Sequence, residues 1–391
     1  MADMKKQHGF GARLAFAVIV IFLAAALIEA AARIIFPSRD AIKTIMKMDA
    51  RRDLNEYEMP DPRYPYINWV LRPSFSRTFK EAIEAKQREG RALGAANLEK
   101  LAADLGVGED EVVYRINSDG YKGPEIDKAH SKTRILTIGD SCTFGSLVDK
   151  HSYPRVLERE LLALGKNVEV INAGVEGYHP KNVLLRMDEL KALKPDIATI
   201  YIGWNALDGE PATGLERSLY SVRLAKSALR KIFHFFDSPQ KAALFEYSQP
   251  RHPDASAPDV KSLDGYSPLF MKDVEKIAEE LRSIGCKVVF VTLPSLYVMW
   301  EVPSETAMKV GSLPPYTDNP YVWAKVVEQY NIDIRKLAQE DGLAVVDLER
   351  WSRTALVPRD AYFGDSVHLD DRGQEMIGEY MAEEISPLLP K

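Results

Sequence analysis

The sequence is poor in cysteine and carries no excess of positive charge. Only two cysteines, Cys142 and Cys286, occur in 391 residues, so a disulfide framework is excluded, and no cysteine or histidine spacing matches a zinc site. The 51 lysines and arginines are outnumbered by 57 aspartates and glutamates, which indicates no polybasic surface for nucleic acid. We therefore expect no metal, no other cofactor and no nucleic-acid partner.

The composition that is present is that of a globular protein. Hydrophobic residues make up 46% and charged residues 28% of the chain, values that exclude a wholly disordered or collagen-like protein. The length fits one large domain with extensions, or two ordinary domains. We detect no internal repeat.

The first forty residues differ from the rest of the chain. Residues 14–28 form an uncharged apolar run, which basic residues up to Arg13 precede and Glu29 and Arg33 follow. The run is shorter than the roughly 20 residues that cross a hydrocarbon core. The long stems of Arg13 and Arg33 can extend it, because cationic side chains reach toward the interface.

Three interpretations of this segment stay open: a transmembrane signal anchor over residues 14–36, a cleaved signal peptide, or a buried helix of a soluble protein. Small residues at positions 24–26 and 30–32 offer cleavage sites. The charges around the run favour insertion with residues 1–13 in the cytoplasm. We expect the anchor, and hence a single-pass membrane protein with the rest of the chain outside the cytoplasm.

The rest of the chain divides into a linker with an N-terminal extension, residues 37–130, and a domain over residues 131–391. Residues 37–73 are polar and proline-rich and indicate a tether with turns. Residues 79–105 are charge-dense and alanine-rich and indicate an exposed helix. Residues 112–116 indicate a short strand.

From residue 134 onward, apolar strands alternate with amphipathic helices. Strands that are apolar along their whole length and separated by helices indicate an α/β fold with a parallel sheet covered on both faces. The predicted strands are residues 135–138, 168–171, 197–202, 288–293 and 343–346, and the predicted helices are residues 153–164, 182–193, 269–284, 321–340 and 371–385.

The alternation lapses over an insertion at about residues 208–266. It contains a basic and aromatic helix-like segment, residues 219–236, and a predicted loop, residues 250–258. A connection this long is either a functional lid or a solvated excursion without a role.

Polar loops follow the predicted strands, at the sheet edge where doubly wound folds bind their ligands. The loops contain Gly139-Asp140-Ser141, Asn172-Ala173-Gly174 and Gly203-Trp204-Asn205, and Asp365 and His368 precede the last helix. A serine hydroxyl needs an imidazole to take its proton and a carboxylate to orient that imidazole. The amides of Ser141 and Gly174 and the Asn205 side chain can supply donors to an oxyanion. These residue types match acyl transfer through serine.

The four blocks, in this order, resemble the SGNH (GDSL-type) hydrolase superfamily over about residues 134–389. The N-terminal apolar segment, followed by residues 114–121, resembles a membrane-anchored bacterial group of that superfamily. The resemblance implies a flavodoxin-like three-layer α/β/α fold that follows an N-terminal transmembrane helix. Together with the expected anchor, it implies a single-pass protein of the bacterial inner membrane with its catalytic domain outside the cytoplasm.

The resemblance also implies roles for individual residues. Ser141 is the implied nucleophile, His368 the base and Asp365 the acid that orients it, and the implied oxyanion hole consists of Ser141, Gly174 and Asn205. The third block departs from the family pattern, because Ala206 stands where an aspartate usually follows the asparagine. Asp208 is the candidate substitute.

The expected function is that of an exported, membrane-tethered serine esterase or O-acetyltransferase. Its expected substrate is an acylated glycan or a small ester, attacked through an acyl-serine intermediate. A lipid esterase and a non-catalytic glycan-binding or scaffold protein of the cell envelope are the alternatives. The aromatic residues Tyr178, Trp204, Tyr297 and Trp300 are further candidates for substrate contact, with core packing as the simpler interpretation. Surface positions are expected for His151, His179, His234 and His252, of which His179 is also a candidate for substrate contact.

Overall fold

The computed structural model describes residues 2–35, 54–65, 67–88, 98–209, 211, 219, 221–222 and 247–390. The chain forms two compact units, one of residues 1–50 and 212–245 and the other of residues 51–211 and 246–391. The predicted segment 219–236, with His234, lies almost wholly outside the described residues.

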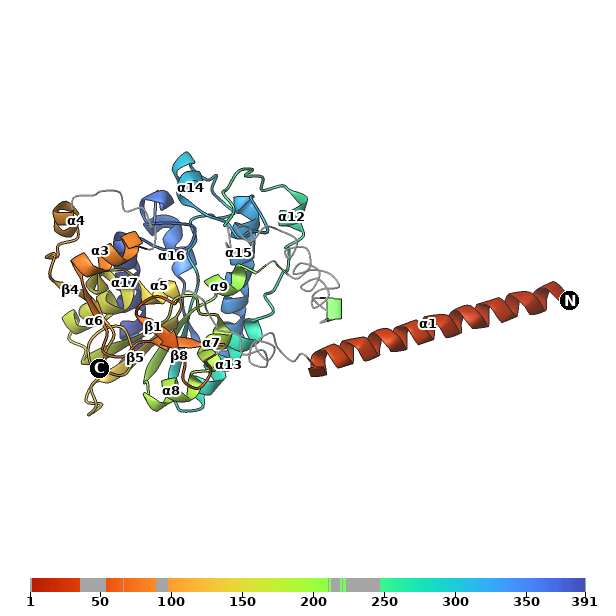
Figure 1. Cartoon of the computed structure of the whole chain (residues 1–391), viewed down its shortest axis with the longest axis horizontal. Helices are drawn as coiled ribbons and strands as arrows, with labels where there is room; N and C mark the ends of the chain where they lie inside the picture. The colour runs from red at the N-terminus through yellow and green to blue at the C-terminus, as the bar shows by residue number, and fades with distance from the viewer. Residues whose placement is uncertain are drawn as a thin grey trace. The chain divides into compact units, whose positions relative to one another are not determined.

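In the smaller unit, the N-terminal segment is a single helix, α1 (Ala2–Ile35) (Figure 1). Its apolar side chains are exposed, for example Phe22 at 73%. In the part of the chain that the structure describes, no helix combines the length and the apolar character needed to cross a membrane. The predicted transmembrane anchor over residues 14–36 is therefore not supported, since charged residues bound the apolar run at Arg13 and Glu29.

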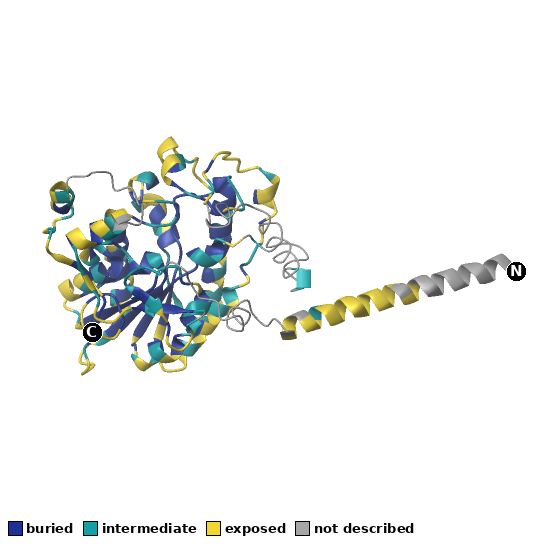
Figure 2. Cartoon of the chain, viewed as in Figure 1, coloured by how far each residue is buried: buried dark blue, intermediate teal, exposed yellow. Residues whose placement is uncertain are grey.

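The larger unit is built on a five-stranded parallel sheet. Its strands lie in the order β6 (Val168–Gly174), β5 (Thr133–Gly139), β7 (Ile197–Tyr201), β8 (Lys287–Val291) and β9 (Ala344–Val346). Counted along the chain this order is 2-1-3-4-5, the doubly wound order of flavodoxin-like folds. Figure 2 shows these strands as mostly buried. The predicted α/β fold with a parallel sheet is confirmed.

Helices cover both faces of this sheet. From β5 the chain first moves to β6 on one side and then to β7, β8 and β9 on the other side. Because such crossovers are right-handed, the helix between β5 and β6 lies on the opposite face of the sheet from the helices between the later strands. Accordingly α6 packs on α17, and α13 packs on α7 and α8. The bounds are α6 (Tyr153–Ala163), α7 (Pro180–Leu184), α8 (Met187–Ala192), α13 (Met271–Arg282), α15 (Pro320–Asp341) and α17 (Asp371–Ile385).

The single helix predicted over residues 182–193 is two helices in the structure. α7 ends at Leu184 and α8 begins at Met187. Arg186, between them, is buried and its guanidinium lies over the Tyr121 ring. Arg186 also pairs with Glu189 of α8, and apolar periodicity does not reveal this polar contact.

The N-terminal extension is folded and is not a tether in its described part. β1 (Glu58–Pro60) pairs with β2 (Trp69–Leu71), and β3 (Ser76–Thr78) pairs with β4 (Val112–Arg115). Trp69 and Leu71 are buried. The tether prediction is thus wrong for residues 54–73, because strands of three residues are too short to show a hydrophobic period.

The helix predicted over residues 79–105 is also only partly right. The described residues form α3 (Phe79–Arg88) and α4 (Leu98–Asp104). Both helices bury apolar side chains in a second core, which includes Phe79, Ile83, Ala102, Val113 and Tyr114. Val148 of the following domain also belongs to this cluster, so the cluster joins the extension to the domain.

Short helices complete the larger unit. Their bounds are α5 (Ser141–Phe144), α9 (Trp204–Leu207), α12 (Pro258–Lys261), α14 (Glu305–Val310) and α16 (Leu348–Ala355), with 3-10 turns at Asp149–His151, Arg359–Ala361 and Ser386–Leu388. The described end of the predicted insertion, residues 247–266, packs on α15 through buried Val260 and Leu263 and an ion pair of 2.9 Å between Lys325 and Asp264.

Candidate active site

Two glycines allow a helix to begin directly at the carboxyl ends of β5 and β6. Gly139 and Gly174 are paired in register at these ends. A Cβ atom on Gly139 would lie 1.9 Å from Thr143 Oγ1, and one on Gly174 would lie 2.3 Å from the backbone nitrogen of Phe144. α5, which begins with Ser141, can occupy this place only because both positions lack a side chain.

Asp140 caps α5 and holds Ser141 at its first position. The Asp140 carboxylate accepts a hydrogen bond of 3.1 Å from the Cys142 amide and is fully buried. Burial raises the pKa of Asp140 to about 6, although the Cys142 amide and the charge of His368 favour its ionised form. Among the described residues the Ser141 amide has no backbone acceptor. It is therefore free to bind a ligand.

The residues predicted as nucleophile, base and acid lie in one hydrogen-bonded arrangement, here called the triad. Ser141 Oγ lies 2.7 Å from His368 Nε2, and His368 Nδ1 lies 2.7 Å from Asp365 Oδ2. Because the carboxylate faces Nδ1, it favours the tautomer that leaves Nε2 to accept the serine proton. Residues 227 positions apart are thus within proton-transfer distance.

Backbone contacts fix the loop that contains Asp365 and His368. Asp365 Oδ1 accepts the amides of Val367 and His368, each at 2.8 Å. Ser366 is buried, its carbonyl accepts the Leu296 amide at 3.1 Å, and its hydroxyl accepts the Ser312 amide at 2.9 Å. Sequence reasoning missed this anchoring role of Ser366, for which the only signal is a small polar residue between the aspartate and the histidine.

The electrostatics of the triad favour a charged pair. Burial lowers the pKa of His368, but the hydrogen bond and charge of Asp365 outweigh it, with help from Asp140 and Glu176, and the pKa is raised. Burial raises the pKa of Asp365, but hydrogen bonds from His368 and two amides lower it below its usual value. The His368 side chain keeps 42% of its surface exposed, so substrate can reach the imidazole.

The structure changes one part of the predicted oxyanion hole. The Gly174 amide is buried and donates to Asn172 Oδ1 at 2.9 Å, so it is not available to a ligand. Gly177, three residues further on, has a left-handed φ of 74°, and its amide has no backbone acceptor within the described part of the chain. Asn205 Nδ2 donates to the carbonyl of Tyr178 at 3.2 Å, which leaves its second hydrogen for a ligand.

Asp208 does not take the place of the missing aspartate of the third block. It follows α9, and its Oδ2 accepts the Tyr247 hydroxyl at 3.1 Å. Burial raises the pKa of Asp208 to about 7, and the charges of Asp140 and Asp365 add to this effect. The amides of Gly203 and Trp204 instead favour the ionised form of Asp140.

The remaining histidines and aromatic residues have other surroundings. His151 lies against Glu375, and His252 lies 2.9 Å from Asp318. Both have acidic partners that are too distant in sequence for spacing to reveal. His179 is exposed at the start of α7. Core packing is confirmed for Tyr178, Trp204 and Tyr297, whereas Trp300 is 43% exposed and lies beneath the Arg353 guanidinium.

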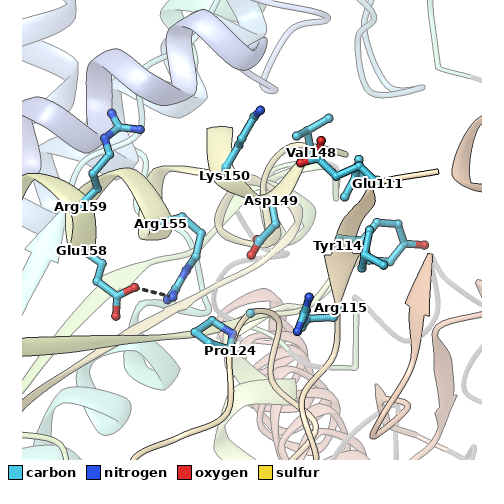
Figure 3. A pocket seen from close by; sticks show the side chains of 13 residues that line it. Glu111, Tyr114, Arg115, Pro124, Val148, Asp149, Lys150, Arg155, Glu158 and Arg159 are labelled. Carbon is cyan, nitrogen blue, oxygen red and sulfur yellow. Dashed lines mark hydrogen bonds and ion pairs between the residues drawn. The ribbon is translucent and has the colours of Figure 1, made fainter. Parts of the chain in front are cut away.

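A separate pocket of about 390 Å³ opens beside β4 and α6 (Figure 3). Charged side chains of both signs line it, and Arg155 pairs with Glu158 at 2.8 Å. No member of the triad contributes to its wall. Within the described residues, no three histidine, cysteine or acidic side chains gather in a way that could hold a metal ion.

The fold and the triad define a serine hydrolase, and comparison with known families agrees. The chain belongs to the GDSL-like Lipase/Acylhydrolase family, whose sequence profile matches residues 137–376. By this membership it is an ester-hydrolysing enzyme. No match to a functionally curated protein was found.

Several solved structures are similar to the chain at low identity. A lipase/acylhydrolase from Enterococcus faecalis is 20% identical, with 66% of this chain and 97% of that chain covered and a TM-score of 0.39. The acetyl xylan esterase AlAXEase is 16% identical, with coverages of 64% and 98% and a TM-score of 0.38. A mutant of Axe2, an acetyl-xylooligosaccharide esterase from Geobacillus Stearmophilus, is 18% identical, with coverages of 65% and 94% and a TM-score of 0.39.

The pKa of His368 gives a first prediction. Because Asp365 raises that pKa, kcat/KM of the wild-type enzyme should fall as pH decreases. The apparent pKa of this fall, the acid limb of the pH profile, should be higher than the pKa of an ordinary histidine. Asp365→Asn should move this acid limb to lower pH and reduce kcat by about 10³- to 10⁴-fold. Rates with p-nitrophenyl acetate between pH 5 and 9 measure both effects. Asp318→Asn, which removes the acidic partner of His252, is the control, and an unmoved acid limb in Asp365→Asn would contradict the assignment.

The raised pKa of Asp208 gives a second prediction. In the unfolded chain Asp208 ionises near pH 4, whereas in the folded protein its pKa is about 7. Between these values the free energy of unfolding falls as pH rises, because the folded state holds the proton more tightly. Asp208→Asn cannot ionise and still accepts the Tyr247 hydroxyl. The Tm of Asp208→Asn minus the Tm of wild type should therefore be larger at pH 8 than at pH 5. An equal difference in Tm at both pH values would refute this prediction.

Proposed function

We propose that this enzyme cleaves or transfers short acyl esters through an acyl-Ser141 intermediate. The contact of 2.7 Å between Ser141 Oγ and His368 Nε2 carries the proposal. As Oγ attacks the ester carbonyl, Nε2 takes the hydroxyl proton, and Asp365 stabilises the imidazolium. The imidazolium then protonates the leaving alkoxide, and water or an acceptor hydroxyl removes the acyl group by the reverse sequence.

The oxyanion of the tetrahedral intermediate needs donors that the folded protein does not already use. The Ser141 amide, the Gly177 amide and the second hydrogen of Asn205 Nδ2 meet this requirement, and the Gly174 amide does not. Each such donor lowers the barrier by about 3 kcal/mol. We therefore assign Gly177, and not Gly174, as the second donor.

The proposed substrate is an acylated sugar or another small ester. In its favour, the imidazole is 42% exposed, so a bulky alcohol group can leave or enter. The lipid-esterase alternative needs an apolar channel for a long chain, and the aromatic residues Tyr178 and Trp204 beside the site are packed in the core. The intact contacts of the triad argue against the non-catalytic alternative.

Covalent labelling tests the nucleophile. A fluorophosphonate probe should label the wild-type protein at Ser141, because the probe reacts only with a serine whose proton is removed. Ser141→Ala should lose labelling and at least 10³-fold of the p-nitrophenyl acetate rate. Ser256→Ala, at an exposed serine, should behave as wild type. Labelling that survives in Ser141→Ala would remove the proposed mechanism.

Placement of the catalytic domain outside the cytoplasm stays a proposal, separate from the anchor. It rests on the basic residues before the apolar run of residues 14–28 and on Glu29 after it, a pattern that directs export. A reporter that matures only outside the cytoplasm, fused to the C-terminus, should be active. Deleting residues 2–35 should abolish that activity, and a fusion active only in the cytoplasm would contradict export.

A further inference from the structure

A hairpin outside the family match contacts the loop that follows β6. This N-terminal hairpin comprises residues 54–71 and contains β1 and β2. The Tyr57 hydroxyl donates to Glu176 Oε2 at 2.5 Å, and Asn55 Nδ2 donates to the same oxygen at 2.7 Å. Trp69 Nε1 donates to the backbone carbonyl of Glu176 at 3.1 Å. Three donors from one segment therefore converge on a single residue of the loop.

The loop held in this way adjoins the proposed oxyanion donors. Glu176 precedes Gly177, and the carbonyl of the next residue, Tyr178, accepts the Asn205 side chain at 3.2 Å. The Tyr178 hydroxyl in turn donates to the carbonyl of Trp69. The hairpin thus contacts the loop on both sides of Gly177 and reaches Asn205 through one intervening residue.

The same hairpin also contacts the nucleophile helix. The Tyr57 ring stacks on Phe144, with ring centroids 5.3 Å apart and planes inclined by 16°. Phe144 is the last residue of α5, which begins with Ser141, and it is buried. One tyrosine therefore connects the element that carries the nucleophile to the loop that carries a donor.

We propose that the N-terminal hairpin completes the active centre, with Asn55, Tyr57 and Trp69 as positioning residues for the loop of residues 176–178, which carries the Gly177 donor and contacts Asn205. This inference rests on the proposed function. A donor stabilises the oxyanion only when it is held at the position where charge develops, and small displacements of catalytic groups reduce the rate strongly. The hairpin supplies this constraint from outside the family-matched residues 137–376.

Glu176 gives the proposal a second consequence. The negative charge of Glu176 favours the His368 imidazolium, and Asn55 and Tyr57 hold that carboxylate through its Oε2 atom. Glu176→Gln removes the charge and keeps a side chain of the same shape that can accept both hydrogen bonds. The acid limb of kcat/KM should then move to lower pH, an effect that a purely structural role would not produce.

Two tyrosine variants form a matched pair for the positioning role. Tyr121 is buried and Tyr57 is half-buried, and the Tyr121 hydroxyl donates to Glu189 Oε1 in α8 at 2.7 Å, not to the loop of residues 176–178. Each of the variants Tyr57→Phe and Tyr121→Phe removes one hydroxyl that donates a hydrogen bond to a glutamate, and both glutamates belong to the larger unit. In the full chain we expect Tyr57→Phe to lower kcat about tenfold with KM nearly unchanged. We expect Tyr121→Phe to change neither kcat nor KM. Tm should fall by a similar amount in both variants.

The outcomes separate this inference from the proposed function. Equal kcat in the two tyrosine variants would overturn the positioning role. An acid limb in Glu176→Gln that coincides with wild type would overturn only the effect of the Glu176 charge on His368. If Ser141→Ala loses fluorophosphonate labelling while Tyr57→Phe retains full kcat, only the hairpin inference fails. If the wild-type protein is not labelled at all, the proposed function itself fails.

Discussion

The chemistry of this protein depends on one short contact, the 2.7 Å between Ser141 Oγ and His368 Nε2. The two atoms belong to opposite ends of the domain sequence, and only the parallel sheet brings them to one edge. β5 delivers Ser141, and the segment after β8 holds the loop of His368 through Ser366. Gly139 and Gly174 permit the approach, because a Cβ on either would collide with α5. The glycines of the motif are therefore as necessary to the contact as the serine.

Negative charge around His368 forms the second constraint. Asp365, Asp140 and Glu176 all favour a positive imidazole, which suits a base that must hold a proton during acyl transfer. Carboxylates gathered in this way repel one another and lose hydration. Burial first, and then like charges, raise the pKa of Asp208 to about 7, so part of the acidic cluster is kept protonated near neutral pH.

Sequence reasoning succeeded where one physical signal was repeated along the chain. The five strands of the sheet were predictable because both of their faces are covered and most of their residues are apolar. The triad was predictable because polar residues follow those strands at one edge. Sequence reasoning failed where the decisive contact leaves no mark in the apolar periodicity. Periodicity does not show that the Asn172 side chain accepts the Gly174 amide, that the buried Arg186 lies between two separate helices, or that the three-residue strands β1 and β2 pair.

The N-terminal extension contacts α5, the helix that begins with the nucleophile, directly. Lys122, fully buried, donates to the carbonyls of Phe144 at 3.0 Å and Ser146 at 2.7 Å. A cation at the carboxyl end of α5 satisfies acceptors that a helix of four residues leaves open. The extension therefore contacts the carboxyl end of α5 in two ways, through the hydrogen bonds of Lys122 and through the Tyr57 ring, which stacks on Phe144. The reacting groups come from the family-matched part of the chain, whereas some of the contacts that hold them in position come from residues before it.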